Sequence, residues 1–318
     1  MIKSTSSWKN PDQHLKQLLT TPWYRALNKI FSQILLLTHD FYKTENITPT
    51  IFPITTGSVS SPFGLGSDSL PVKINIKNND MYLADSMQFS LEIATRLNDR
   101  GAYYIMPSFR GENMDARHLN EFVHSEVEIK GGLDDVMSLA ERYIKYLIRG
   151  LKDTCAKEIA EICGTTEHLD NVLNKPFYKI RFEDAMRELS DMPDAFKELD
   201  KGLYAITSTG ERALIDKYGD FTWITHMPYK SVPFYQAKEA GTDFSMTGDL
   251  LAGIGETLGC GQRVLSSQDA IKSLDEHNVD KSGYQWYIDM RDIQQIQTAG
   301  FGMGIERFIL WLLKHNDI

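Results

Sequence analysis

Three short segments combine charged side chains, aromatic side chains and glycines at spacings that suit a nucleoside triphosphate. The first is FRGENMDARHLNEF at 109–122. Its Arg110 could hold a phosphate through two parallel hydrogen bonds, and Arg117 with His118 could hold further phosphates. Phe122 offers a face on which an adenine ring could stack. Taken alone, the segment also fits a solvated, charged hairpin tip.

The second segment, DLLAGIGETLGCGQR at 249–263, carries two carboxylates around a glycine-bearing turn. Asp249 and Glu256 at the ends of neighbouring strands would suit a Mg²⁺ ion that bridges phosphates. Arg263 lies seven residues after Glu256, so on a regular strand the two side chains would face opposite sides. We expect a bulge at the glycines to realign them. The alternative is a glycine-rich strand with ordinary surface charges.

The third segment, GFGMGIERFILWLL at 300–313, has alternating glycines followed by an apolar run. It predicts a strand and a turn that lead into a helix, with glycines that allow close contact between strand and helix. Arg307, at the start of this helix, is either solvated at the helix edge or directed into a site. The glycine spacing does not match the GxGxxG dinucleotide-binding pattern.

The elements that must position these segments are strands flanked by helices. Apolar residues recur through 22–43 at positions such as Tyr24, Phe31 and Leu35, which predicts a long helix. The segment ENITPTIFPITTG contains Pro49 and Pro53 and therefore predicts an edge strand or an extended interface segment. Further elements are expected at 72–78, 80–85, 86–97, 104–130, 133–163, 221–228 and 266–276. No regular βαβ alternation occurs, so we predict an α+β fold with an antiparallel sheet flanked by helices. We expect one catalytic domain over 1–318 with a helical insertion at about 164–220.

Composition narrows the class of protein. The chain has 318 residues, is 42% hydrophobic and carries a net charge of −9, which argues against a broad basic face for nucleic acid. Cys155, Cys163 and Cys260 form no CxxC pair, so neither a disulfide framework nor a zinc site is expected. No secretory signal and no apolar run of membrane-spanning length occurs. We therefore expect a cytoplasmic protein with no membrane partner.

Together these segments resemble the class II aminoacyl-tRNA synthetases. FRGE and RHLNEF resemble motif 2, GFGMGIERF resembles motif 3, and ITPTIFPITTG after a long helix resembles motif 1. In that family the motif 1 proline lies at a dimer interface, which implies a homodimer here through Pro49 or Pro53, with Pro49 favoured. Within the class, DLLAGIGETLGCGQR and YQWYIDMRD are most similar to the asparaginyl-tRNA synthetases.

The resemblance implies a role for each matching residue. Arg110 and Arg307 would be catalytic, Asp249 and Glu256 would carry Mg²⁺, and ATP would be the second substrate. Glu112 would contact the adenine amino group. The implied ATP-binding set is Arg110, Glu112, Arg117, His118, Phe122 and Arg307.

The amino acid would contact Gln88 near its α-amino group and Arg263 at its side chain. Aspartate-binding relatives have a lysine three residues after the position of Gln88, where this chain has Leu91. The resemblance therefore implies an amino acid of the aspartate or asparagine type and leaves the choice between them open.

Only some twenty residues precede the motif 1 helix, which leaves no room for an anticodon-binding domain. In this organisation the chain is similar to the archaeal-type asparagine synthetase A group. We therefore expect an ATP- and Mg²⁺-dependent ligase that forms an aminoacyl-adenylate, releases pyrophosphate and transfers the amino acid to ammonia or another non-tRNA amine. The alternatives are a tRNA-charging asparaginyl paralogue and an inactive ligand-sensing paralogue.

Overall fold

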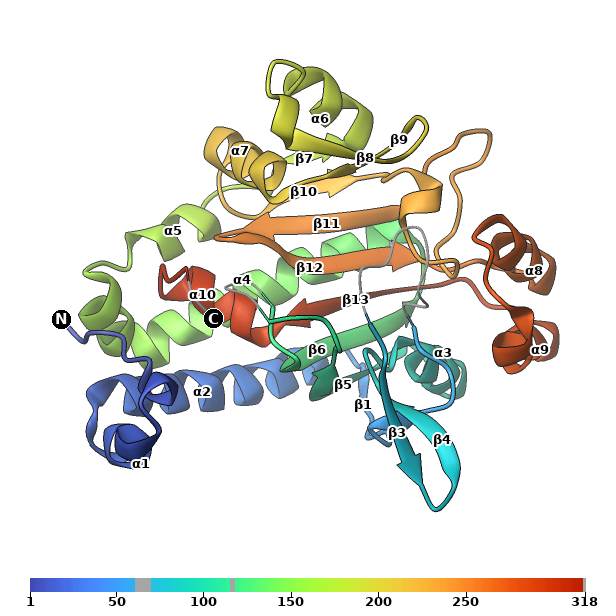
Figure 1. The fold of residues 1–318 in the computed structure, drawn as a ribbon. Coiled ribbons are helices and arrows are strands. Elements are labelled where there is room, and N and C mark those ends of the chain that lie inside the picture. Colours follow the sequence, from blue (N-terminus) through green and yellow to red (C-terminus); the bar gives the residue numbers. More distant parts are fainter. Residues whose placement is uncertain (61–69, 115–117, 317–318) are drawn as a thin grey trace.

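The fold is built on a large, mostly antiparallel sheet. The structure is a computed structural model that describes residues 1–60, 70–114 and 118–316. Within them the largest sheet has eight strands in the order β1-β5-β6-β13-β12-β11-β10-β7 (Figure 1). The strands are β1 (Thr48–Pro49), β5 (Gly101–Phe109), β6 (Glu121–Lys130), β7 (Lys179–Arg181), β10 (Thr222–Thr225), β11 (Thr247–Ala252), β12 (Gly255–Gln262) and β13 (Thr298–Gly304).

Neighbouring strands in the interior of this sheet run antiparallel, whereas the two edge strands are parallel to their partners. Pro49 lies on edge strand β1, where its missing N–H leaves no gap in a central ladder. The predicted α+β class, the edge position of this proline-containing segment and the hairpin of β5 and β6 are therefore confirmed.

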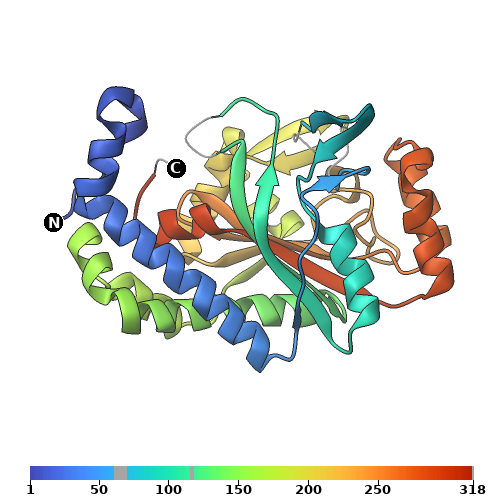
Figure 2. The same cartoon turned by 90° about the horizontal axis from the view of Figure 1, so that it is seen from below.

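One face of the sheet is covered by α2 (Pro22–Thr44), α4 (Leu133–Cys163) and α10 (Ile305–Leu312). Figure 2 shows α2 and α4 side by side beneath the strands. The buried stripe of α2 includes Ile30, Ile34 and Phe41. The expected apolar stripe was partly wrong, because Leu35 is 39% exposed. The helix turns a different line of residues, spaced three or four apart, toward α4.

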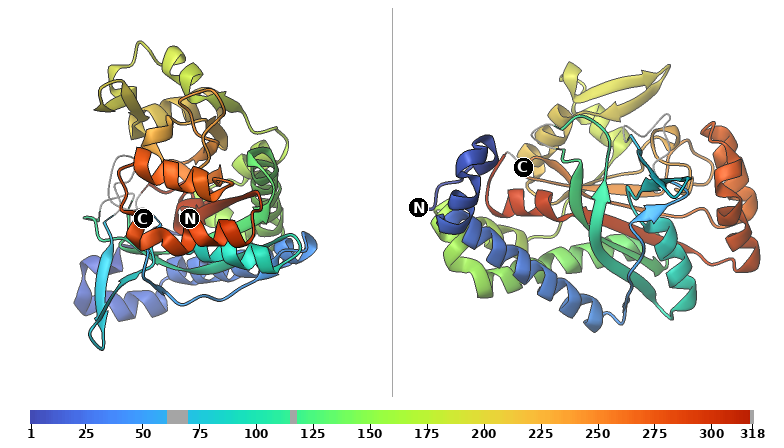
Figure 3. Two further views of the ribbon diagram at one scale, coloured as in Figure 1. Left: turned by 90° about the vertical axis from the view of Figure 1, so that its right-hand side faces the viewer. Right: turned by 60° about the horizontal axis from the view of Figure 1, so that its bottom comes forward.

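The opposite face carries α3 (Gln88–Leu97), while α8 (Ser267–Glu276) and α9 (Gln285–Ile293) lie at one end of the sheet. Alternation along β6 separates the two faces, because Val127 and Ile129 join the core with α2 and α4 while Glu128 contacts α3. Helices α8 and α9 pack together at one end of the sheet (Figure 3) around Phe89 of α3. Helix α9 was not among the elements expected from the sequence.

A separate three-stranded sheet precedes α3 in the chain. It consists of β2 (Thr55–Thr56), β3 (Val72–Ile76) and β4 (Asn79–Leu83). Lys77 and Asn78 join β3 to β4 with φ angles of 49° and 68°, the left-handed backbone of a tight hairpin turn. The strands expected at 72–78 and 80–85 are confirmed.

Residues 164–220 contain strands as well as helices. Strand β7 joins the large sheet, while β8 (Phe196–Asp200) and β9 (Leu203–Ile206) form a separate hairpin. The helices of this segment are α5 (Glu167–Leu173), α6 (Phe182–Glu188) and α7 (Ser208–Tyr218). Apolar side chains from most of this segment pack against Ile224 and Leu251 of the large sheet and form a separate cluster there.

At the amino end, α1 (Pro11–Thr20) buries none of its residues. The 3-10 helices are η1 (Ser7–Lys9), η2 (Pro193–Ala195), η3 (Tyr229–Ser231) and η4 (Lys281–Tyr284). Across the described part of the chain, no helix combines the length and apolar character that crossing a membrane requires.

Candidate active site

A cavity of about 290 Å³ lies over the face of the large sheet that carries His124 and Glu126 of β6. It gathers residues from elements that are far apart in the sequence. The residues expected from the sequence that line it are Gln88, Arg110, Asp249, Glu256 and Arg263. The fold therefore brings the candidate phosphate-binding arginine, the two candidate metal carboxylates and both candidate amino-acid contacts to one place.

The carboxylates of Asp249 and Glu256 share one side of this cavity. A methyl group built on Gly259 would meet Glu256 Oε1 at 2.9 Å and Asp249 Oδ1 at 3.4 Å. Burial, and then the neighbouring Glu256 charge, raise the pKa of Asp249 well above its ordinary value. Two adjacent carboxylates that repel one another form a site at which a divalent cation would be favourable.

A bulge in β12 lets Glu256 and Arg263 face the same cavity. The register shifts between Leu250 and Leu251 of β11, so that Thr257 of β12 is the extra residue. Its hydroxyl donates to backbone carbonyls of the turn between the two strands. The expected bulge is therefore present, but it lies at Thr257 rather than at a glycine.

Arg110 is held at the end of β5 by its own hairpin. Its backbone N–H donates to Asn120 O at 2.9 Å, and Asn120 Nδ2 donates back to the Arg110 carbonyl at 2.8 Å. The guanidinium lies over the Phe122 ring, 5.3 Å from its centroid. Among the described residues the buried Nε of Arg110 has no hydrogen-bond partner. An anion that accepted from Nε would remove the cost of this unpaired donor.

The other ATP contacts expected from the sequence that the structure describes lie outside the cavity lining. Glu112 accepts a hydrogen bond from the Leu70 backbone N–H at 3.2 Å. Arg307 Nη1 donates to the Glu256 carbonyl at 2.6 Å, which connects the start of α10 to the carboxylate pair. Within the described residues, Glu112, His118, Phe122 and Arg307 do not line the cavity. Arg117 lies outside the described residues.

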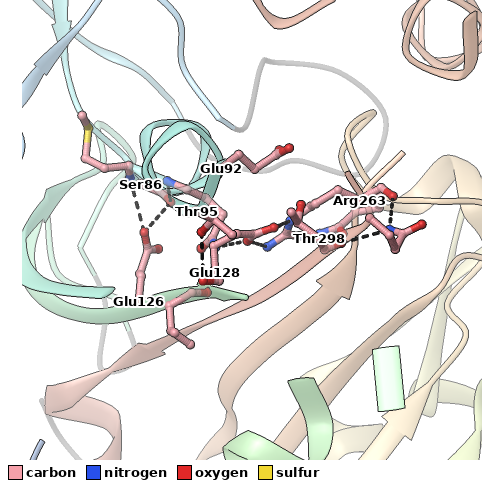
Figure 4. A network of polar contacts seen from close by, with 12 residues as sticks. Ser86, Glu92, Thr95, Glu126, Glu128, Arg263 and Thr298 are labelled. Carbon is pink, nitrogen blue, oxygen red and sulfur yellow. Dashed lines mark hydrogen bonds and ion pairs between the residues drawn. The ribbon is translucent and has the colours of Figure 1, made fainter. Parts of the chain in front are cut away.

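At the other end of the cavity, Arg263 is paired with the buried Glu128. The distance from Arg263 Nη2 to Glu128 Oε2 is 2.9 Å (Figure 4). The Arg263 Nη1 donates to Gln236 Oε1 at 2.8 Å. Gln88 Nε2 donates to the same Glu128 carboxylate at 2.5 Å. Burial raises the pKa of Glu128, and the Arg263 charge opposes this effect. Glu128 and Gln236 thus orient the Arg263 guanidinium at the wall of the cavity.

Glu126 lines the cavity but was not among the residues expected from the sequence. It accepts from Ser86 Oγ at 2.7 Å and from the Tyr104 hydroxyl, and His124 Nδ1 lies 3.1 Å from its Oε1. Burial by itself would raise the pKa of Glu126, but His124 and these hydrogen bonds outweigh burial and lower it. The structure therefore has an ionised carboxylate in the same cavity as Arg263.

Glycines of β13 create the space above these glutamates. Gly300 pairs with Glu128, and Gly302 pairs with Glu126. A methyl group on Gly300 would overlap Glu128 and Gln88, and one on Gly302 would lie 2.9 Å from Glu126 Oε1. The alternating glycines of GFGMG are thus the sequence signal that could have pointed to the residues on the neighbouring strand.

The carboxylate pair supplies only part of a cation site. In the described ranges, no group of three or more His, Cys, Asp or Glu side chains gathers as a metal site would require. A Mg²⁺ ion at Asp249 and Glu256 would therefore take its other ligands from phosphate oxygens and water, as Mg²⁺ commonly does in nucleotide sites. The donor set fits that ion.

Comparison with known proteins identifies the family. The family of tRNA synthetases class II (D, K and N) matches residues 13–318. A relative from Encephalitozoon cuniculi (strain GB-M1), named probable asparagine–tRNA ligase, cytoplasmic, is 29% identical over 304 residues. The match covers 91% of this chain and 64% of that relative, so the chain spans less than two thirds of the relative's length.

Solved structures share the fold. Asparaginyl-tRNA synthetase from Pyrococcus horikoshii, in complex with asparaginyl-adenylate, has a TM-score of 0.85 and 23% identity, covering 99% of this chain and 73% of that one. Asparaginyl-tRNA synthetase from Entamoeba histolytica, also in complex with asparaginyl-adenylate, has a TM-score of 0.82 and 22% identity, covering 99% and 71%. The α+β architecture is thus that of the class II catalytic fold. Since the family match extends over almost the whole chain, this protein belongs to the class II tRNA synthetases (D, K and N).

Proposed function

We propose that this protein is an ATP-dependent ligase that activates asparagine as asparaginyl-adenylate and releases pyrophosphate. The observation that carries this proposal is the single cavity in which Arg110, the Asp249 and Glu256 carboxylates, and the Glu126 and Arg263 side chains meet. Membership of the class II family supports it, as does the likeness to two asparaginyl-tRNA synthetases whose structures contain asparaginyl-adenylate.

The chemistry needs positioning and cationic groups more than proton transfer. A carboxylate oxygen of the amino acid forms a bond to the α-phosphorus of ATP, and the bond from that phosphorus to the pyrophosphate breaks. We assign Arg110 to the α-phosphate and the attacking carboxylate, since it lines the cavity and its buried Nε has no hydrogen-bond partner among the described residues. Mg²⁺ held by Asp249 and Glu256 would neutralise charge on the phosphates.

The remaining ATP contacts are assigned from their motifs. Arg307 would hold the outer phosphates from the start of α10, where it already anchors the backbone of Glu256. Glu112 would accept from the adenine amino group, and Phe122 would stack on the adenine ring. Arg117 and His118 would complete the set of outer phosphate contacts.

The charges at the amino-acid end favour asparagine over aspartate. A side-chain amide has an N–H₂ group that can donate to Glu126 and a carbonyl oxygen that can accept from Arg263. An aspartate carboxylate would instead place a second negative charge beside the ionised Glu126. Leu91, which is fully buried, supplies no compensating cation from α3. Gln88 would lie near the substrate's α-amino group.

For the acceptor we favour tRNA, with ammonia or another amine as the competing candidate. Ammonia would convert an aspartyl-adenylate into asparagine, and that route requires the amino acid that Glu126 disfavours. The relative from Encephalitozoon cuniculi is named as a tRNA ligase and as cytoplasmic, and we propose the same acceptor class and the same setting for this chain.

An amino-acid panel in a pyrophosphate-exchange assay tests the activation step. We expect exchange with asparagine and at least about tenfold less with aspartate, since burying an unpaired like charge costs more than ~1.4 kcal/mol. Exchange with aspartate alone would contradict the choice of asparagine, and exchange with no amino acid would indicate an inactive ligand-sensing paralogue. Charging of total tRNA, compared with product formation from ammonium without tRNA, then identifies the acceptor.

We also propose a homodimer formed through the motif 1 region. On α2, Leu36 is 56% exposed, and Ile51, close to Pro49 after β1, is 92% exposed. Apolar side chains this exposed favour an interface. Sedimentation should give twice the chain mass, and Ile51→Glu should shift the equilibrium toward the monomer. A wild-type protein that sediments as a monomer at all concentrations would contradict the dimer.

A further inference from the structure

Arg291 of α9 is a buried arginine that lies outside the cavity and connects two elements of its wall. It is 1% exposed. Its Nε donates to the Val264 carbonyl at 2.9 Å, and its Nη2 donates to Glu92 Oε2 at 2.8 Å. The Tyr287 hydroxyl donates to the other Glu92 oxygen at 2.6 Å. One guanidinium therefore joins the chain just after β12 to the middle of α3.

The two joined elements carry the candidate amino-acid contacts. Glu92 lies one helical turn after Gln88 on α3, and Val264 directly follows Arg263. On the cavity side, Gln88 and Arg263 meet through Glu128. The contacts thus form a closed ring with Glu128 on one side and Arg291 on the other. Figure 4 shows Glu92, Glu128 and Arg263 within this polar network.

We propose that Arg291 is a positioning residue for amino-acid recognition, which sets the separation of Gln88 and Arg263 by tying α3 to the end of β12. The inference rests on the proposed function, because it takes Gln88 and Arg263 as contacts of the amino acid. Glu92 on α3 accepts hydrogen bonds from both Arg291 and Tyr287 of α9, and these three side chains together make the connection to α3.

The chemistry of the ring favours positioning over simple stabilisation. A buried ion pair contributes little net stability relative to a well-packed apolar pair of the same size, but its hydrogen bonds fix one geometry. The Arg291 Nε donates to the Val264 carbonyl, Nη1 to the Tyr287 carbonyl and Nη2 to the Glu92 carboxylate. A planar donor with fixed directions therefore holds α3 and the end of β12 in one relative position.

The chain offers a matched control in Arg96. It is also buried, its Nη1 lies 3.6 Å from the same Glu92 carboxylate, and its Nε donates to Gln294 O near the end of α9. Among its described contacts none is with the end of β12. Arg96→Gln therefore weakens the same charge cluster without releasing the strand end that carries Arg263.

The experiment compares Arg291→Gln, Tyr287→Phe and Arg96→Gln with the wild type in asparagine-dependent pyrophosphate exchange. We expect Arg291→Gln to raise KM for asparagine by about tenfold or more, since hydrogen bonds to charged groups are lost. Tyr287→Phe should raise it by a smaller factor. KM for ATP should change less than about twofold in both, and Arg96→Gln should leave KM for asparagine near the wild-type value.

The outcomes separate positioning from stability. If Arg291→Gln and Arg96→Gln lower Tm alike while KM for asparagine is unchanged in both, Arg291 is a structural residue and the inference is wrong. If Arg291→Gln does not fold, Tyr287→Phe decides: a raised KM supports the inference and an unchanged KM overturns it. Calorimetry also gives the Kd of each variant for asparagine, a measurement that does not depend on catalysis. A wild type that binds asparagine without exchange contradicts the proposed function but still lets the Kd values decide the role of Arg291.

Discussion

The Arg263 guanidinium and the Glu128 carboxylate form a buried ion pair with 2.9 Å between Nη2 and Oε2, and their side chains are 3% and 0% exposed. Glu128 also accepts from Gln88. A charge so completely removed from water depends on its partner, because an unpaired buried ion retains the full cost of desolvation. This pair thus links the stability of the protein to the geometry of the proposed amino-acid site.

Glu128→Gln should lower the free energy of unfolding by about 3–5 kcal/mol, since it leaves the Arg263 charge buried and unpaired. Urea denaturation measures the change. Glu239→Gln is the control, because the Glu239–Arg181 pair is partly exposed at 26% and 36% and should cost at most ~1 kcal/mol. Similar costs in both variants would contradict the special burial of Glu128.

Arg110→Ala should reduce pyrophosphate exchange by at least about 100-fold, because it removes the donor that we assign to the α-phosphate. Its Tm should stay close to that of the wild type, since the Arg110 Nε has no described partner to lose. Arg187→Ala, at a side chain that is 77% exposed, serves as the control and should retain full exchange. Wild-type exchange in Arg110→Ala would refute the assigned role.

Asp249→Asn should stabilise the protein in the absence of Mg²⁺ and abolish stabilisation by Mg²⁺. Burial and the Glu256 charge raise the pKa of Asp249, so its ionised form is unfavourable in the folded state by ~1 kcal/mol or more. The amide removes that repulsion together with a candidate metal ligand. Thermal unfolding with and without Mg²⁺ measures both effects, with the exposed Asp200→Asn as the control. A lower Tm in Asp249→Asn without Mg²⁺ would count against the carboxylate pair as a cation site.

His168 should contribute to a loss of stability in acid. Its Nε2 lies 3.0 Å from the Leu312 carbonyl, while its buried Nδ1 has no partner in the described structure. Burial lowers the pKa of His168 below 6.5. The unfolded chain therefore binds more protons as pH falls below 6.5, so stability is present above that value and is lost as pH falls through the lower folded pKa.

His168→Gln can keep the hydrogen bond to Leu312 without titrating. Between about pH 7.5 and about pH 5.5, its free energy of unfolding should fall by roughly 0.5–1 kcal/mol less than that of the wild type. Urea denaturation at the two pH values tests this, with the exposed His14→Gln as the control. An equal fall in the wild type and in His168→Gln would show that other groups cause the acid sensitivity.

The sequence was informative wherever a local pattern decides the outcome. The spacing of apolar residues and the positions of prolines and glycines each act over a few residues of the chain. These local signals predict the helix at 22–43, the hairpin that presents Arg110, the edge position of Pro49 and the strand–helix junction at Arg307. The same local segments contained Asp249, Glu256 and Arg263, which do line the cavity. Residue type and spacing along the chain were enough to nominate them.

Only the tertiary structure decided which residues share a cavity and in what charge state. Glu126 and Glu128 look like alternate polar residues of a strand, and their roles depend on glycines that pair with them from β13, some 170 residues later. Arg291 gains its contacts from α3 and from the end of β12, which no local pattern connects. Position along the sequence reveals which groups are present, whereas burial and partners across the sheet fix their pKa values and orientation. The sequence by itself therefore pointed to the class of chemistry that we propose, and the folded sheet decided the geometry on which the proposed choice of amino acid rests.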